Sequence, residues 1–394
     1  MIYMNLNRRN LLKQLGAGIT ASSLLAPERA SADSVECALD SKALPQHLEP
    51  IRLDHNENAY GASPKAITSI QESAKGTIRY PNSGPFVKTL ADHHSETASG
   101  ANHVIKPEQI VVGCGSSDVL RMAASAFLAP GASLITATPT CDLIAQYGRS
   151  RGATITEIPL RNDHAHDLQA TLKHSNKSAA SGLIYMCNPN SPTGTLTTRQ
   201  ELEEFLAKVS PKFQVVIDEA YHHYAGGSGA YRSFIDRPSD NPRVIVTRTF
   251  SAAYGLAGAR VGYAVASTSN AERMDREALP FALNRAGMFA ALAALADREH
   301  IETCIDRNVN DRQEFMNQVN ARMLRALDSH TNFVCLNVMR PAVEISAHYA
   351  KNDFVLAPLI PSMPNYLRIS LGTPQEMRQF WHVWDLLGSH PMSM

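Results

Sequence analysis

The chain has 394 residues, of which 44% are hydrophobic and 19% are charged. This length and composition allow a sizeable core and predict one large α/β domain with a smaller second domain. Lys plus Arg equals Asp plus Glu at 37 each, and no basic tract or basic-aromatic pattern occurs, which excludes a nucleic acid as the expected partner. A small-molecule ligand is expected instead.

The first 32 residues differ from the rest and resemble a twin-arginine export signal. Arg8-Arg9 precedes an apolar, small-residue run that is too short to span a bilayer, and "ASA" at residues 30–32 fits a cleavage site. Asn7 and Leu11 depart from the usual Ser/Thr and Phe of this signal, and an uncleaved amphipathic helix is the alternative. The segment predicts a periplasmic or otherwise exported protein with no further membrane association.

The cysteines show no pattern that indicates a metal site. No Cys-x-x-Cys pair or disulfide-scaffold spacing occurs, and an oxidising compartment would permit disulfides that the sequence alone does not pair. The six are Cys37, Cys114, Cys141, Cys187, Cys304 and Cys335.

Strand and helix patterns alternate through the middle of the chain. Apolar, β-branched runs predict strands at 109–114, 133–139, 153–160, 182–189, 213–221 and 243–250, and helical spacing predicts helices at 116–129, 142–152 and 198–209. Thr198 is placed to cap the last of these helices. The alternation predicts an α/β fold, with a mostly parallel sheet covered by helices on both faces.

The pattern along the chain also predicts its domain organisation. Residues 33–80 are expected to form an N-terminal arm and part of a small domain, and residues 81–270 the large domain. Residues 271–394 are expected to form a helical connection and a small C-terminal α+β domain, with strands at 331–338 and 366–372. Ligands of such folds bind beyond the carboxyl ends of the strands, where the polar motifs of this sequence fall.

Two turns at these strand ends carry candidate binding residues. Gly115 permits a tight turn before a helix, where free amides and the Ser116 hydroxyl favour an anion. "NPNSPTG", from Asn188 to Gly194, predicts a rigid turn with polar side chains facing the strand ends. Taken singly, the first also fits an ordinary serine-capped turn and the second an ordinary loop.

A carboxylate stands at the end of another apolar strand, in "VVIDEAYHHY". Buried carboxylates are rare unless they are paired, so Asp218 is expected to face a cation such as a protonated pyridine nitrogen. Tyr221 follows by three residues and can reach the same ligand. The alternative for Asp218 is a helix cap.

"RTFSAAYGLAGARVGY", residues 248–263, offers a cluster of hydroxyls and a guanidinium. Thr249, Ser251 and Arg260 suit a phosphate, because arginine binds phosphate through two parallel hydrogen bonds. An arginine in a structural ion pair is the alternative.

In this order and at this spacing, the motifs resemble fold-type-I enzymes that depend on pyridoxal 5′-phosphate (PLP), in the histidinol-phosphate aminotransferase-like branch of the class I and II aminotransferases. "LDHNENAYGASPKA", "RYPNSG" and "NYLRISLGT" resemble further segments of that branch. The resemblance covers residues 51–375. It implies that residues 81–270 form the PLP-binding domain.

The resemblance also implies a role for each candidate residue. The phosphate ligands would be Gly115, Ser116, Thr249, Ser251, Arg260 and, across a homodimer interface, Tyr60. Asp218 would pair with the pyridine nitrogen and Tyr221 with the ring oxygen. Arg368 would bind the carboxylate of an amino-acid substrate, with Asn332 a second substrate-side candidate.

The largest departure from the family is Ala252, which stands where the family has its lysine, eight residues before Arg260. That lysine forms a Schiff base with the cofactor and carries the substrate proton, and alanine does neither. No lysine occurs between Lys212 and Lys351. His222 or His223 is a candidate substitute base, although surface histidines on a helix are the expected assignment.

Three smaller departures accompany it. Cys141 replaces the aromatic residue that stacks on the ring in the family. Ser191 replaces an asparagine that hydrogen-bonds the ring oxygen, and Asn188 or Asn190 is a candidate to take over that role. Ala357 stands where an arginine grips the phosphate of histidinol phosphate, which argues against a phosphorylated substrate. These departures and the retained leader favour natural loss of the lysine over an introduced Lys→Ala replacement.

Three functions follow as alternatives. The first is an exported, homodimeric aminotransferase-like protein that acts on an amino acid or amine, with turnover impaired or altered by Ala252. The second is a noncatalytic binding protein for PLP, held noncovalently or as an aldimine already formed with an amine. The third is a PLP-dependent lyase or decarboxylase, since one fold hosts several chemistries.

Overall fold

The computed structural model describes residues 49–97 and 104–387. The predicted export signal and the first part of the predicted arm lie outside the described residues. No helix within the described ranges is long and apolar enough to cross a membrane.

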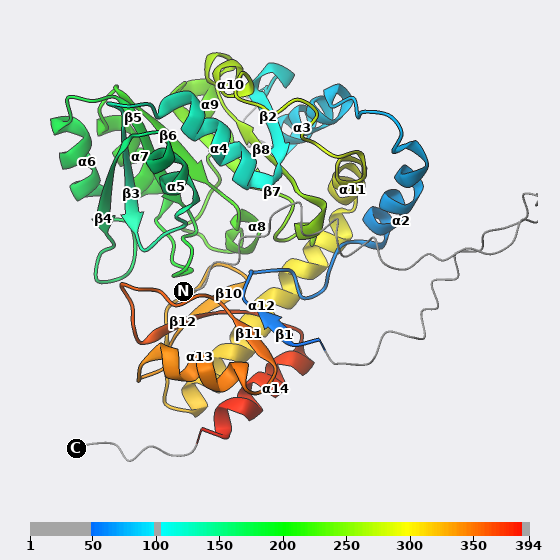
Figure 1. Cartoon of the computed structure of the whole chain (residues 1–394), viewed down its shortest axis with the longest axis vertical. Coiled ribbons are helices and arrows are strands. Elements are labelled where there is room, and N and C mark those ends of the chain that lie inside the picture. The colour runs from blue at the N-terminus through cyan, green and yellow to red at the C-terminus, as the bar shows by residue number, and fades with distance from the viewer. Residues whose placement is uncertain (1–48, 98–103, 388–394) are drawn as a thin grey trace, which may run out of the picture. The chain divides into compact units, whose positions relative to one another are not determined.

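A seven-stranded sheet forms the large part of the fold (Figure 1). Its strands are β2 Ile110–Cys114, β3 Ser133–Thr138, β4 Thr154–Pro159, β5 Gly182–Cys187, β6 Phe213–Asp218, β7 Val244–Thr249 and β8 Val261–Val265, in the order β2-β8-β7-β6-β5-β3-β4. The pairs from β4 to β7 are parallel, and β8 is antiparallel to both neighbours. The α/β prediction with a mostly parallel sheet is confirmed.

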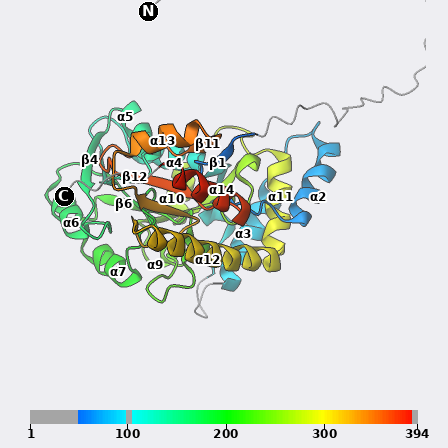
Figure 2. The same ribbon diagram turned by 90° about the horizontal axis from the view of Figure 1, so that it is seen from below.

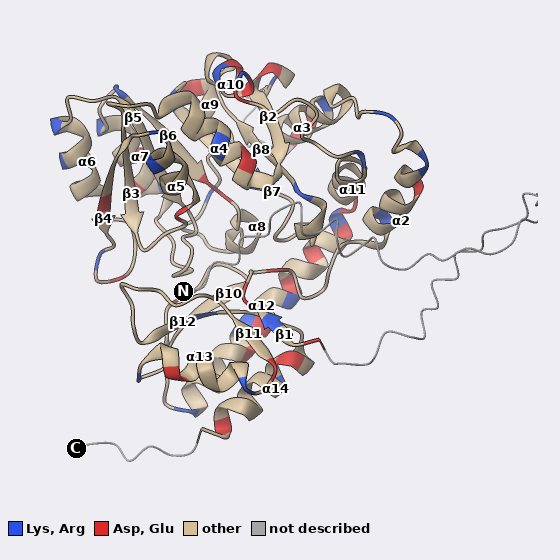
Figure 3. Ribbon diagram, in the orientation of Figure 1, with Lys and Arg blue, Asp and Glu red and all other residues tan. Residues whose placement is uncertain are grey.

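Helices cover both faces of this sheet because alternate strand residues point to opposite sides. One face, with Val111, Leu183 and Val216, packs against α4 Gly115–Phe127, α5 Leu143–Ser150 and α10 Thr268–Asp275. The other packs against α3 Gly84–Thr97, α6 Leu168–Lys177, α7 Arg199–Lys208 and α11 Arg285–Ala296. The strands are almost free of charged residues, which gather on the helices and loops (Figure 3).

Two smaller sheets are formed mainly by the C-terminal part of the chain. In the first, β1 Ile51–Leu53 pairs in parallel with β11 Phe354–Leu356. In the second, β10 Phe333–Asn337 pairs antiparallel with β9 Arg325–Ala326 and β12 Tyr366–Ser370. The strands predicted at 331–338 and 366–372 are present, whereas the two- and three-residue strands were not predicted. The domain boundaries at residues 80 and 270 stay predictions.

The remaining helices connect or cover these sheets. The long helix α12 Arg298–Ala321 leads from α11 to β9 and packs against α14 Pro374–Asp385 (Figure 2). Helix α2 Pro64–Ser73 packs on α11, and α13 Ala342–Ala350 packs on β11. The short helices are α8 His222–Ala225, α9 Arg237–Asp240, and the 3₁₀ turns Ala74–Gly76, Pro107–Gln109 and Ala257–Ala259.

Helix α7 begins where the sequence predicts. The Thr198 hydroxyl accepts a hydrogen bond from the Glu201 amide, and the Glu201 carboxylate accepts one from the Thr198 amide. This reciprocal cap satisfies amides that have no partner within the helix. Thr198 is confirmed as the N-cap.

Candidate active site

The candidate site is a cavity of about 730 Å³ at the carboxyl ends of β3, β5, β6 and β7. The turns that follow these strands open at one edge of the sheet, and residues 358–361 with β12 line the opposite side. Ten predicted site residues line it: Ser116, Cys141, Ser191, Asp218, Tyr221, Thr249, Ser251, Ala252, Arg260 and Arg368. The structure thus brings the motifs of the sequence into one cavity, while their individual binding roles stay predictions.

Arg260 organises one end of the cavity. Its guanidinium donates to the hydroxyl of Ser117 at 3.1 Å, to the hydroxyl of Ser251 at 3.4 Å and to the carbonyl of Ala257 at 3.0 Å. The hydroxyls of Ser116 and Thr249 line the same cavity. A guanidinium surrounded by hydroxyls is a donor set that suits a phosphate.

Gly115 lets this guanidinium approach the start of helix α4. Its φ is +78°, and a Cβ at this position would lie 2.3 Å from an Arg260 guanidinium nitrogen. Any other residue would push Arg260 away from the helix N-terminus. The amides of the first helical turn and the positive end of the helix dipole therefore act at the same place as the guanidinium, so the residues present fit a phosphate group.

Asp218 ends β6 and is 4% exposed. Its carboxylate accepts hydrogen bonds from the Tyr185 hydroxyl at 2.8 Å and the Thr247 hydroxyl at 3.0 Å. Burial raises the pKa of Asp218, and these two hydrogen bonds oppose that rise. No helix begins at Asp218, so the capping alternative does not apply, and a buried carboxylate that lines the cavity is suited to a cationic ring nitrogen.

Tyr221 lies three residues beyond Asp218 and contacts the N-terminal arm. Its hydroxyl accepts a hydrogen bond from the Asn56 side chain at 2.8 Å, and its ring lies edge-on to Phe333 with centroids 5.1 Å apart. Burial raises the pKa of Tyr221 to about 12, and Arg368 opposes that rise. The phenol thus keeps its proton at neutral pH and can donate a hydrogen bond to a ring oxygen.

Ala252 lies three residues beyond the end of β7 and is 5% exposed. Its methyl group packs with Ala253, Tyr224 and Tyr221 and lines the cavity. No lysine is among the described residues that line this cavity. The described lining therefore presents no lysine amine to a ligand held there.

Arg368 lies at the other end, on β12. One guanidinium nitrogen donates to the Ser191 hydroxyl at 3.3 Å, another contacts the Asp54 carbonyl, and the buried Nε has no partner. Buried donors without partners are uncommon, because leaving one unpaired costs free energy. Arg368 is thus poised to bind an anionic group of a ligand.

Two thiols line the ring region of the cavity. Cys141 stands where an aromatic residue was expected, and Cys187 ends β5. Burial and the Asp218 carboxylate raise the pKa of both thiols. Each therefore stays protonated and acts as a small apolar wall rather than as a nucleophile.

Four predicted binding residues do not line this cavity, and one of them, Gly115, shapes it by admitting Arg260 to the start of helix α4. The side chain of Asn188 donates to the Thr197 carbonyl at 3.0 Å and accepts from the Thr197 amide at 2.9 Å, so it fixes the turn. The side chain of Asn332 donates to the carbonyl of Asn56 at 2.8 Å and so holds the arm. The Tyr60 hydroxyl donates to Asp311 at 2.6 Å, and its contact with the site of a second subunit stays a prediction.

A buried histidine just before helix α6, His166, contacts the turn that Asn188 fixes, and its ring lies 2.8 Å from the Thr197 hydroxyl. Burial, with a smaller effect of Arg161, lowers the pKa of His166 to about 4. The folded protein excludes a proton that the unfolded chain takes up below a pH of about 6.5. The contribution of neutral His166 to the free energy of unfolding is therefore fully present above about pH 6.5 and is lost as the pH drops toward 4.

Removing this histidine is expected to flatten that dependence. Between pH 6.5 and 4.5, the unfolding free energy of His166→Gln is expected to fall by about 2 kcal/mol less than that of the unaltered protein. Urea unfolding at pH 7.0, 6.0, 5.0 and 4.5 measures the difference between the two slopes. Parallel curves for the two proteins would show that His166 is not the source.

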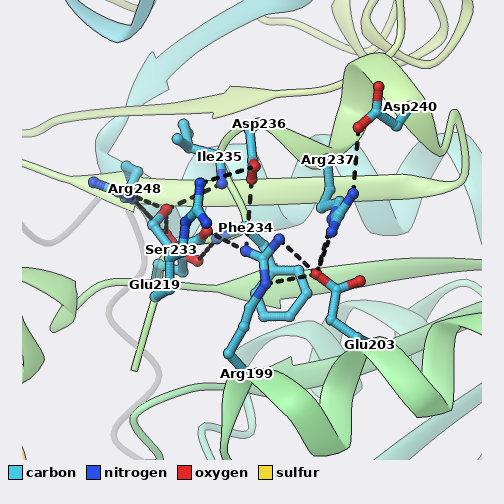
Figure 4. A network of polar contacts seen from close by, with 11 residues as sticks. Arg199, Glu203, Glu219, Ser233, Phe234, Ile235, Asp236, Arg237, Asp240 and Arg248 are labelled. Atoms are coloured by element: carbon cyan, nitrogen blue, oxygen red, sulfur yellow. Dashed lines mark hydrogen bonds and ion pairs between the residues drawn. The ribbon is translucent and has the colours of Figure 1, made fainter. Parts of the chain in front are cut away.

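A buried ion pair supports the strands beneath the site. Arg248 on β7 and Glu219 after β6 are 2.8 Å apart and almost fully buried, and the Glu219 carboxylate accepts from the amide of Phe234 at 2.6 Å. Arg199 and Ser233 extend this network to α7 and the segment before α9 (Figure 4). The network fixes the residue that follows Asp218 and the residue that precedes Thr249.

His222 and His223 lie on helix α8, as expected, but neither is a fully exposed surface histidine. Both are half-buried, and the His222 ring contacts the Arg248 guanidinium. Burial and Arg248 lower the pKa of both histidines, that of His223 to about 3, so both rings are neutral at neutral pH. Neither is among the described residues that line the cavity, so neither is placed to act as a base there.

Sequence reasoning missed several residues of the site. Tyr185 and Thr247 lie on the same sheet face as Asp218, because they occupy matching alternate positions of neighbouring strands. Asn56 and Ser117 reach the cavity from the arm and from α4. Only the strand registers could have identified Tyr185 and Thr247. In the described part of the chain, no group of three or more His, Cys, Asp or Glu residues is placed to hold a metal.

Comparison with known proteins agrees with this geometry. Residues 49–383 match the family model of class I and II aminotransferases. The chain is 35% identical over 336 residues to histidinol-phosphate aminotransferase of Methylobacillus flagellatus, which covers 85% of this chain and 88% of that one. The corresponding protein of Caldicellulosiruptor saccharolyticus is 34% identical over 331 residues, covering 84% and 89%.

A solved structure gives the same result. The histidinol-phosphate aminotransferase of Sinorhizobium meliloti, in complex with pyridoxal-5′-phosphate, matches with a TM-score of 0.77 at 26% identity. The match covers 86% of this chain and 92% of that one.

Proposed function

Because the chain belongs to the class I and II aminotransferases, a family of PLP-dependent enzymes, we propose that it binds PLP and an amino acid in the strand-end cavity and that Ala252 slows its transamination. One observation carries this proposal. Arg260 with its surrounding hydroxyls, the buried Asp218 carboxylate and an arginine with an unpartnered Nε, Arg368, line one cavity, whose described lining contains no lysine.

The residues of the chain divide the binding task among themselves. Arg260, with the hydroxyls of Ser251 and Ser117, would hold the phosphate, and Asp218 would hold a proton at the ring nitrogen. When bound, PLP supplies an electron-withdrawing ring that stabilises negative charge at the carbon next to the substrate amine. Tyr185 and Thr247 orient the Asp218 carboxylate for this contact.

The substrate would be held at the opposite end. The unpartnered Nε of Arg368, with its neighbouring guanidinium nitrogens, suits the carboxylate of an amino acid. The methyl group of Ala252 accepts no proton, so removal of the substrate proton lacks its usual base. General acid-base catalysis contributes about a hundredfold to ten-thousandfold to rates, which sets the size of the expected loss.

A noncatalytic binding protein is the second candidate, and Ala252 favours it specifically. Such a protein would retain Asp218, Arg260 and Arg368 for binding and would need no proton carrier. Both candidates require PLP binding and differ in residual turnover. No observation of the cavity favours a lyase over either.

The test measures binding and turnover on the full chain. PLP is expected to bind in equilibrium dialysis and to leave on denaturation, with no stoichiometric covalent attachment after borohydride reduction. Transamination of supplied amino acids is expected to stay far below the roughly 10 s⁻¹ that is typical of enzymes. Failure to bind PLP would refute the site, and an ordinary rate would refute the effect assigned to Ala252.

A further inference from the structure

An apolar segment forms part of the cavity wall beside Arg368. Pro358, Leu359, Ile360 and Pro361 line the cavity between β11 and β12. Ile360 packs with Cys335 of β10, and Cys335 is the register partner of Arg368 on β12. The segment therefore lies next to the guanidinium that is proposed to hold the substrate carboxylate.

Leu359 is the exposed member of this wall. It is 44% exposed, whereas Ile360 is 6% exposed and anchored in the fold. Covering apolar surface is favourable by about 25 cal/mol per Å² removed from water. A ligand that covers Leu359 with an apolar group gains this energy, and one that places a charge there loses hydration without a partner.

The charges of the cavity leave no cation for a second anionic group. Arg260 and Arg368 are the only arginines in the described lining, and the proposed function assigns one to the phosphate and the other to the carboxylate. The remaining basic side chain in the described lining is His55, whose ring lies 2.6 Å from the Asp54 carboxylate. A glutamate side chain or a second phosphate would meet no free positive charge.

Asp218 is assigned to the ring nitrogen, and the other two acidic residues of the cavity lining, Asp54 and Asp142, do not suit a cationic side chain either. The Asp54 carboxylate lies 2.8 Å from Arg52 as well as beside His55. The Asp142 carboxylate lies 3.1 Å from Arg149. Both carboxylates are already paired, so a substrate amine would have to displace an arginine.

We propose that the amino acid held at Arg368 has an uncharged, apolar side chain, and that Leu359 and Ile360 form the wall against which this side chain packs. The proposal rests on the proposed function, because it uses Arg368 as the carboxylate site and Arg260 as the phosphate site. It extends that function by naming the substrate class.

Stable phosphopyridoxyl conjugates of amino acids test this proposal by calorimetry on the full chain. The leucine conjugate is expected to bind at least about tenfold more tightly than the glutamate, lysine and histidinol-phosphate conjugates. In Leu359→Arg, the glutamate conjugate is expected to gain about tenfold in affinity and the leucine conjugate to lose affinity. Leu386→Arg, which changes a leucine that is 56% exposed and outside the cavity lining, is expected to change neither.

Binding of PLP alone distinguishes failure of the proposed substrate class from failure of the proposed function. If PLP binds but all conjugates bind equally, or a charged conjugate binds most tightly, the substrate class is wrong and the proposed function stands. If neither PLP nor any conjugate binds, both proposals are wrong. An unchanged preference in Leu359→Arg would show that Leu359 is not part of the wall.

Discussion

Ala252→Lys is expected to attach PLP covalently to the chain and to raise transamination by about a hundredfold to ten-thousandfold over the unaltered protein. The Ala252 methyl lines a cavity of about 730 Å³, so a longer side chain has room to extend toward the ring region. A lysine there would supply both the amine for attachment and a group that moves the substrate proton. Intact mass after borohydride reduction reads the attachment, and oxo-acid formation reads the rate.

The control for this variant is Ala252→Met. Methionine fills similar space without an amine, so it separates the chemical effect from an effect of packing. It is expected to show neither attachment nor a gain in rate. If Ala252→Lys folds but binds no PLP, the assignment of this position is wrong.

Arg260→Ala is expected to weaken PLP binding by about thirtyfold to a few thousandfold. The guanidinium contacts Ser117, Ser251 and the Ala257 carbonyl, and its loss leaves the phosphate with hydroxyls and amides alone. Truncating one partner of a hydrogen-bonded charge pair costs about 2–5 kcal/mol, and each 1.4 kcal/mol is tenfold in affinity. Equilibrium dialysis with PLP measures the change.

Arg243→Ala is the matched control for this experiment. Arg243 precedes β7 and donates to the backbone carbonyls of Leu206, Val209 and Ser210, so its loss also removes three hydrogen bonds. Its effect is expected on thermal stability, with PLP affinity unchanged. Equal PLP affinity in Arg260→Ala and the unaltered protein would refute the phosphate assignment.

The sequence predicted the large sheet well because its strands carry strong local signals. Each of β2 to β7 is an apolar run bounded by polar or glycine residues, and the polar motif after each run falls at a strand end. The short strands β1, β9 and β11 carry no such signal, since two or three residues define no period. Strand β8, Val261–Val265, was missed because its first three residues lie within a motif that was interpreted for its ligand chemistry.

The site was predicted less completely because its contacts depend on strand register and side-chain direction. Asn188 was expected at the cofactor, but its amide completes two hydrogen bonds with the backbone of Thr197. The sequence does not distinguish an asparagine side chain that faces a ligand from one that is hydrogen-bonded within its own turn. The contact between His222 and Arg248 was not predicted either, because the residues around His222 in the sequence do not indicate the buried arginine beside it.

The hydrogen bonds to Asp218 have a consequence for the cost of ligand binding. Tyr185, Asp218 and Thr247 lie on three adjacent strands, β5, β6 and β7, and two hydrogen bonds connect them near the strand ends. The carboxylate is thereby preorganised by the sheet before any ligand arrives, and little side-chain entropy remains to be lost on binding. The cavity, whose described lining contains no lysine, thus presents a rigid carboxylate that is suited to a cationic ring at a low cost in entropy.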